Sequence, residues 1–192
     1  MNFYLEITLN PSPEIPVNFL WEKVYPQVHL ALVEVKDSRG KVDIGLAFPE
    51  YDAKNFHLGS KLRLFSMDKR DLEKLNMFKW LSRLADYIHL SSIQDVPASV
   101  HGYACFTRVQ PKSSNKRLAR RKAKREDISF EKALSFFNKR KIEVSRVPFI
   151  HIKSLSSGSQ YRLMIDNISV KDICTGKFST YGLSSTSTVP IF

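Results

Sequence analysis

The chain has 192 residues, enough for one mid-sized domain or two small ones, and we expect two compact lobes, each with its own hydrophobic core. Apolar residues make up 43% of the chain and aromatic residues 11%, and no apolar stretch approaches the roughly 18 residues of a spanning helix, which excludes a disordered chain and a membrane protein. The 30 Lys and Arg residues outnumber the 19 Asp and Glu residues, and the resulting net charge of +11 favours a polyanionic partner.

The first half of the chain has the order of elements that is typical of a ferredoxin-like lobe. The predicted elements are a strand at 3–9, a helix at 17–35, strands at 42–48 and 61–66, a helix capped by Asp68 and a strand near 85–91. Pro26 should kink the first helix or divide it in two, because an interior proline costs about 3 kcal/mol. The βαββαβ order predicts a ferredoxin-like domain over residues 1–95.

The pattern changes after Val96-Pro97, and we place a second domain at residues 96–192. Its predicted elements are a strand at about 101–109, helices near 115–125 and 130–139, and short strands up to the C terminus. The predicted fold class is therefore α+β, in which the ferredoxin-like lobe is joined to a C-terminal α/β lobe that carries an arginine-rich helix.

The arginine-rich helix is the most informative segment of the sequence. Residues 106–146 hold 14 of the 30 basic residues but only 4 of the 19 acidic ones. With Ser114 or Asn115 as the N-cap, one half of the helix is basic and the other apolar. The basic half holds Lys116, Arg117, Arg120, Arg121, Lys124 and Arg125, and the apolar half Leu118, Ala119 and Ala123.

A solvated helix face normally mixes acidic residues among its basic ones, and a membrane-surface helix needs bulky apolar residues on its other face. The arginine-rich helix has neither feature, so we expect it to bind nucleic acid.

The sequence offers no pattern for a metal site, and we expect neither a metal nor another cofactor. Cys105 and Cys174 belong to no C-x-x-C pair and are interpreted as small apolar residues, and the 5 histidines show no metal-ligand spacing. His29 by itself is interpreted as a surface histidine, because it falls roughly opposite the apolar stripe of its helix. The N-terminal residues lack a secretory signal, so we expect the protein to stay inside the cell.

Short fragments along the whole chain resemble one family in their order and spacing. These fragments are Tyr4-Leu5-Glu6-Ile7, His29-Leu30-Ala31-Leu32, Ile44-Gly45-Leu46-Ala47-Phe48-Pro49, Arg108-Val109-Gln110, the arginine-rich helix, Tyr181-Gly182-Leu183-Ser184 and Val189-Pro190-Ile191-Phe192. They are similar to the CRISPR precursor-RNA endoribonucleases of type I-F systems, the Ypest subtype. Two departures are Pro26, where the family tolerates a small residue, and Lys116, which replaces a proline.

The resemblance implies an enzyme that binds the hairpin of each CRISPR repeat and cuts precursor RNA at the 3′ base of the stem. Attack by the 2′-OH needs no metal and gives a 2′,3′-cyclic phosphate and a 5′-OH. The resemblance further implies that the guide RNA stays bound within the type I-F interference complex, beside its other subunits. We expect a bacterial cytoplasmic protein that is a monomer when free. The alternatives are a non-catalytic RNA-hairpin-binding subunit and a DNA-binding accessory protein.

By resemblance, His29 is the catalytic histidine, Ser154 constrains the nucleophilic ribose and Tyr181 orients the histidine. Histidine suits this chemistry because its pKa near 6.5 lets it exchange protons at neutral pH, as base, acid or both. Ser154 and Tyr181 are otherwise interpreted as a turn residue and a packing residue.

The resemblance also implies a set of residues that hold RNA. Arg108 and Gln110 read base edges near the bottom of the stem, and Tyr161, which stands in place of a phenylalanine, stacks on the last base pair. The remaining expected contacts come from Lys112, Asn115, Ser156 and the basic half of the arginine-rich helix, with Lys116, Arg117, Arg120, Arg121, Lys124 and Arg125.

Overall fold

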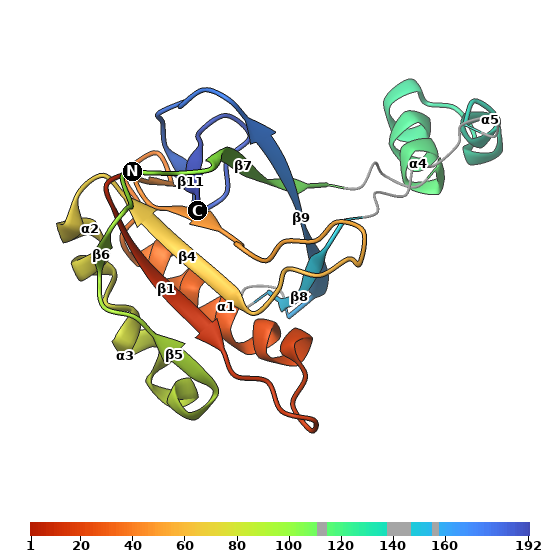
Figure 1. The fold of residues 1–192 in the computed structure, drawn as a ribbon. Helices are drawn as coiled ribbons and strands as arrows, with labels where there is room; N and C mark the ends of the chain where they lie inside the picture. Colours follow the sequence, from red (N-terminus) through yellow and green to blue (C-terminus); the bar gives the residue numbers. More distant parts are fainter. Residues whose placement is uncertain (111–114, 138–146, 155–157) are drawn as a thin grey trace. The chain divides into compact units, whose positions relative to one another are not determined.

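The structure is a computed structural model that describes residues 1–110, 115–137, 147–154 and 158–192 (Figure 1). Of the residues expected to bind RNA, Lys112 and Ser156 lie outside the described ranges. Contacts between residues divide the chain into two units: Met1–Arg108 with Val147–Phe192 form the first unit, and Val109–Arg146 form the second. The second unit is therefore inserted into the sequence of the first.

An antiparallel sheet from the first part of the chain forms one layer of the first unit (Figure 1). Its strands follow the order β3 (Gly45–Ala47), β4 (Lys61–Ser66), β1 (Phe3–Leu9) and β5 (Ile88–Leu90), and β6 (Gln94–Asp95) also pairs with β1. Alternate residues of β1 are buried, as expected for a strand with one face on the core. The strand predicted near 85–91 is shorter than expected, because Ser82–Tyr87 form a 3₁₀ helix.

Helix α1 (Val17–Glu34) lies across one face of this sheet (Figure 1). It runs undivided through Pro26, so the prediction of two short helices is wrong. The buried residues of the predicted apolar stripe are Leu20, Val24, Val28 and Ala31. Burial of large aliphatic side chains is worth about 1.5 to 3 kcal/mol each, which offsets the cost of the proline.

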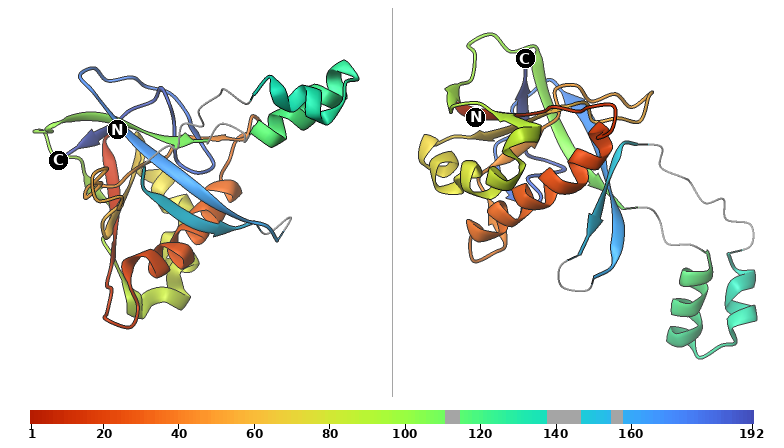
Figure 2. Two further views of the ribbon diagram at one scale, coloured as in Figure 1. Left: turned by 90° about the vertical axis from the view of Figure 1, so that its right-hand side faces the viewer. Right: turned by 90° about the horizontal axis from the view of Figure 1, so that it is seen from below.

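Two short helices follow β4. Asp68 caps α2 (Lys69–Leu75) as predicted, and its carboxylate accepts a hydrogen bond from the Arg70 amide at 2.9 Å. Asn76, with φ 45°, ends α2 and caps α3 (Met77–Leu81), which packs against α1 (Figure 2). These caps fix where the chain turns back toward α1.

A second antiparallel sheet, built mainly from the last part of the chain, completes the first unit. Its strands follow the order β11 (Val189–Ile191), β7 (Gly102–Val109), β9 (Gln160–Val170) and β8 (Phe149–Lys153), and β2 (Lys41–Val42) pairs separately with β10 (Phe178–Ser179). Leu46 and Phe106 belong to one cluster of buried residues although the predicted domain boundary lies between them. A division into domains at residue 95 stays a prediction, and it does not coincide with the two units.

The second unit contains α4 (Asn115–Glu126) and α5 (Phe130–Ser135) (Figure 1). The predicted apolar half of α4 is turned inward, because Ala119 is fully buried whereas all six residues of the basic half are exposed. Asn115 is the first helical residue rather than the N-cap, and its side-chain amide donates a hydrogen bond to the Phe137 carbonyl at 2.8 Å. The helix predicted over 130–139 ends at Ser135.

Candidate functional site

His29 lies on α1 at the edge of the buried stripe, where it is half-buried, whereas its place on the helix by itself indicated a surface histidine. Its Nδ1 lies 2.8 Å from the carbonyl oxygen of Thr180. A carbonyl only accepts hydrogen bonds, so Nδ1 carries the proton and donates it. In a neutral imidazole, Nε2 then holds the free lone pair, so the tautomer is fixed by a backbone group.

The surroundings of His29 favour its neutral form. Burial is the largest influence and lowers the pKa of His29, and the Arg108 guanidinium lowers it further. The hydrogen bond to Thr180 acts in the opposite direction and does not outweigh them. The net direction is downward from about 6.5, so the imidazole is mainly uncharged at neutral pH.

The ring of Tyr181 lies flat against the ring of His29. Their centroids are 4.1 Å apart and their planes differ by 6°. The backbone of Tyr181 is fixed as well, because the buried hydroxyl of Tyr25 donates a hydrogen bond to its carbonyl at 2.8 Å. His29 is therefore held by Thr180 through its ring edge and by Tyr181 through its ring face.

A tight turn presents these two residues to α1. The Gly182 amide donates to the Ser179 carbonyl at 2.8 Å, and the Gly182 carbonyl accepts from the Leu46 amide at 2.9 Å. Gly182 has φ +68°, and a Cβ there would lie 2.2 Å from Cγ of Leu46. Only glycine fits this close, left-handed position.

Tyr161 and Arg108 complete the cluster around His29. The Tyr161 and Tyr181 hydroxyls are hydrogen-bonded at 2.7 Å, and burial followed by this bond raises the pKa of Tyr161 to about 12. The Arg108 guanidinium carbon lies 5.1 Å from the Tyr181 ring centroid and 5.5 Å from that of Tyr161, within cation–π range. Four of the predicted site residues, His29, Tyr181, Tyr161 and Arg108, are thus brought together.

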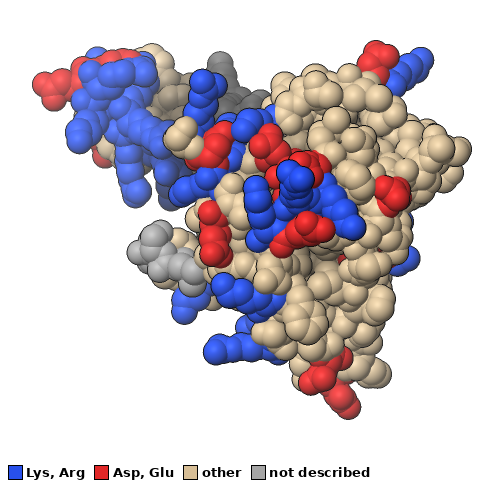
Figure 3. Space-filling model, turned by 90° about the vertical axis from the view of Figure 1, so that its left-hand side faces the viewer, with Lys and Arg blue, Asp and Glu red and all other residues tan. Residues whose placement is uncertain are grey.

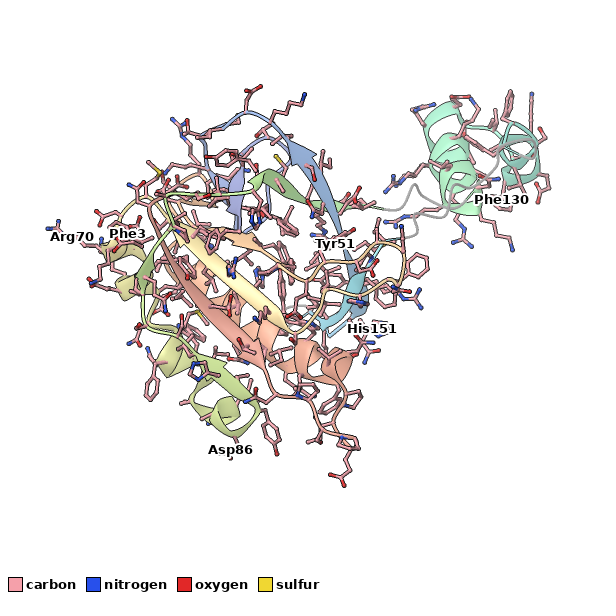
Figure 4. The ribbon with its side chains drawn as sticks, viewed as in Figure 1. Phe3, Tyr51, Arg70, Asp86, Phe130 and His151 are labelled. Carbon is pink, nitrogen blue, oxygen red and sulfur yellow. The ribbon has the colours of Figure 1, made fainter. Side chains whose placement is uncertain are left out.

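Ser154 directly follows β8, in the hairpin that also carries Tyr161. Its amide donates to the Ser159 carbonyl at 2.8 Å, which continues the pairing of β8 with β9. Ile152 pairs with Tyr161, and cross-strand partners point to one face, so Ser154, two positions after Ile152, continues on the face of Tyr161. His151 on the same strand, which is labelled in Figure 4, points to the opposite face.

The other predicted RNA-binding residues belong to the second unit. Gln110, directly after β7, is exposed, and so is the basic half of α4. Figure 3 shows a dense group of Lys and Arg side chains on this unit, whereas basic and acidic side chains are mixed over the rest of that face. Exposed positive charge of this density suits a polyanion.

Two contributors to the site were missed by the sequence analysis. The Thr180 carbonyl is a backbone group and has no signal in the sequence, and Tyr25 looks like any other aromatic of a buried helix face. Within the described residues, no group of three or more His, Cys, Asp or Glu side chains is arranged to hold a metal ion. No helix in the described parts of the chain is long and apolar enough to cross a membrane.

Comparison with known proteins places this chain among the CRISPR-associated proteins. Residues 4–192 match the model of the family described as CRISPR-associated protein (Cas_Csy4). Two relatives, from Escherichia coli (strain UTI89 / UPEC) and Pseudomonas aeruginosa (strain UCBPP-PA14), are each named CRISPR-associated endonuclease Cas6/Csy4. Each is 34% identical over 193 residues, with 100% of both chains covered. The chain belongs to the Cas_Csy4 family, which confirms the predicted resemblance.

Among solved structures, the product of a Cas6-related gene from Pyrococcus furiosus aligns over 100% of this chain and 99% of its own. The identity is 11% and the TM-score 0.35.

Proposed function

We propose that this chain is a CRISPR RNA endoribonuclease that binds the repeat hairpin and cuts precursor RNA at the 3′ base of the stem. The observation that carries the proposal is the position of His29, whose tautomer is set by the Thr180 carbonyl and whose ring is stacked on Tyr181. Membership of the Cas_Csy4 family and the relatives named as endonucleases support the same activity.

The proposed reaction uses the RNA's own 2′-OH as the nucleophile. His29 Nε2 takes the proton of the 2′-OH, the 2′ oxygen bonds to the adjacent phosphorus, and the bond from phosphorus to the 5′ oxygen breaks. The 5′ oxygen takes up a proton from the imidazolium or from water, which leaves a 2′,3′-cyclic phosphate and a 5′-OH. The lowered pKa of His29 and its fixed tautomer favour the role of general base at the first step.

Tyr181 and Ser154 position the reacting groups in this proposal. The Tyr181 ring holds the plane of the imidazole, and the Ser154 hydroxyl constrains the nucleophilic ribose. Tyr161 offers its ring to the last base pair of the stem, and Arg108, at the end of β7, reads a base edge there, with Gln110 beside it. The wider set that holds phosphates includes the basic half of α4 together with Lys112, Asn115 and Ser156.

The order and pairing of the first sheet support a ferredoxin-like assignment for the lobe that carries His29. A split βαβ unit places a later strand between two parallel ones, and here β4 lies antiparallel between β3 and β1, with β5 on the far side of β1. We further propose that the guide RNA stays bound after cleavage and that the protein joins the other subunits of the type I-F interference complex.

The experiment is incubation with a repeat RNA in EDTA, beside the same RNA with a 2′-deoxy sugar at the cleavage position. The expected result is one cut in the first RNA, with a cyclic phosphate end, and none in the second. Binding of both RNAs without any cut would instead identify a non-catalytic hairpin-binding subunit. Cutting of the deoxy RNA would refute the 2′-OH mechanism.

A further inference from the structure

A groove with a volume of about 430 Å³ lies between α1 and the segment formed by α3 and the 3₁₀ helix, within the first unit. None of its lining residues belongs to the cluster around His29. The lining residues that matter for its chemistry are Glu22, Lys23 and Pro26 from α1, and Lys79, Trp80 and Arg83 from the other wall.

The groove combines positive charge with an aromatic surface. Lys23, Lys79 and Arg83 are exposed, and Glu22 is the one carboxylate among the described residues of the lining. Trp80 is half-buried, and the Lys79 ammonium lies 5.9 Å from its ring centroid. Single-stranded nucleic acid is typically bound by cations that neutralise its phosphates and by an aromatic ring on which a base stacks.

Pro26 leaves one backbone acceptor of α1 without its helical donor. Proline has no amide hydrogen, so the Glu22 carbonyl, four residues earlier in α1, does not receive its usual helical donor. Both residues line the groove.

One lining residue of the groove, Glu22, lies on the same side of α1 as His29. Glu22 and His29 are seven residues apart, which is about two helical turns, so both project from one side of α1 at an axial separation of about 10 Å. RNA upstream of a cut at His29 forms the hairpin stem. The strand that begins at the leaving 5′ oxygen is the downstream single strand.

We propose that this groove binds the single-stranded RNA that continues beyond the scissile phosphate. Trp80 stacks on one of its bases, and Lys23, Lys79 and Arg83 neutralise its phosphates. The inference rests on the proposed function, since it assumes that the hairpin is bound with its 3′ base at His29. It adds a second region of RNA recognition, which acts on the precursor before it is cut.

The test compares two repeat RNAs that both carry a 2′-deoxy sugar at the cleavage position, so that neither is cut. One ends directly after the cleavage position, and the other continues as a single strand that contains 2-aminopurine. Wild-type protein should bind the extended RNA about fivefold more tightly or better, the lower limit of stacking on an aromatic ring. The 2-aminopurine fluorescence should fall on binding.

Two variants test the groove residues separately. Trp80→Ala and Arg83→Glu should each lose most of the advantage of the extended RNA while they bind the short RNA as the wild type does. Arg83 is exposed, so its variant tests the proposal even if loss of the Trp80 ring impairs folding. The matched control is Arg70→Glu, the same charge reversal at an exposed residue of α2 outside the groove, which should keep the advantage (Figure 4).

Equal affinity of the wild type for the two RNAs would overturn the proposal, and so would an undiminished advantage in Arg83→Glu. Wild-type protein that fails to bind the short hairpin, or to cut the all-ribose RNA, would instead refute the proposed function on which the inference rests.

Discussion

Cleavage should be lost in acid as His29 becomes protonated, and the sign of this effect follows from the surroundings of the imidazole. Burial and the Arg108 cation lower the pKa of His29 below its usual value of about 6.5. The unprotonated Nε2 is the form that accepts the 2′-OH proton. The rate should therefore be level near neutral pH and fall by about tenfold per pH unit below a midpoint that lies under 6.5.

Removal of the His29 side chain measures how much it contributes to the cleavage rate. General-base catalysis by a positioned side chain contributes about 100- to 10,000-fold, so His29→Ala should slow cleavage by that factor at pH 7.5. Its affinity for an uncleavable hairpin should stay nearly unchanged, because the six exposed charges of α4 lie on another element of the chain. A large loss of affinity would mean that His29 holds RNA rather than acting on it.

The assay is cleavage with enzyme in excess of RNA but below saturation, where the rate reports the pKa of the free enzyme. Proton NMR of the 5 histidines provides an independent value, and the His29 signal is the one absent from His29→Ala. An acid limb with its midpoint above 6.5, or the same limb in the alanine variant, would refute the assignment of His29 as the base.

Three further predictions concern other parts of the chain. Reversal of Arg121 and Lys124 to Glu should weaken the binding of all hairpins alike. In the wild type, if about five charges contact phosphates, the logarithm of the binding constant should fall with the logarithm of the salt concentration at a slope near −4.5. A slope near zero would contradict this. Gly182→Ala should lower both the melting temperature and the cleavage rate. The control is Gly40→Ala, which is also at positive φ but has no atom within 4 Å of an added Cβ, and it should lower the free energy of unfolding in chemical denaturation by only about 1 kcal/mol. Tyr161→Phe removes a hydroxyl bonded at 2.7 Å and should reduce the free energy of unfolding by about 1 kcal/mol, with little effect on stacking; an unchanged value would show that the bond contributes nothing.

The regular elements were predictable where a clear apolar period was present. The strands at Phe3–Leu9 and Lys61–Ser66 and the start of α2 lie at the predicted residues. The errors occur where tertiary contacts override a local rule. Pro26 was expected to kink α1 or divide it in two, and the helix is not divided, because its buried face contributes more than the proline costs.

The assignment of the two units also depends on contacts that local patterns do not contain. The Val96-Pro97 pair marks a change of pattern in the sequence, yet Leu46 and Phe106 on either side of it pack in one cluster. The residues that separate from this cluster are Val109–Arg146, the segment richest in positive charge. The high charge of this segment is consistent with its separation, because charged residues add little to a common core.

The site was the least predictable part, because His29 acquires its properties from residues far away in the sequence. Its place on the helix indicated a surface histidine, and only the family resemblance selected it. Its tautomer is set where a turn brings the Thr180 carbonyl, 151 positions later, to 2.8 Å from Nδ1 of the ring. Its pKa is lowered by burial and by Arg108, against the opposite effect of that hydrogen bond. The tight turn that carries Thr180 also requires a residue without a side chain at position 182, which is Gly182. Chemistry that depends on a backbone carbonyl and on a missing Cβ is visible only when the chain is folded.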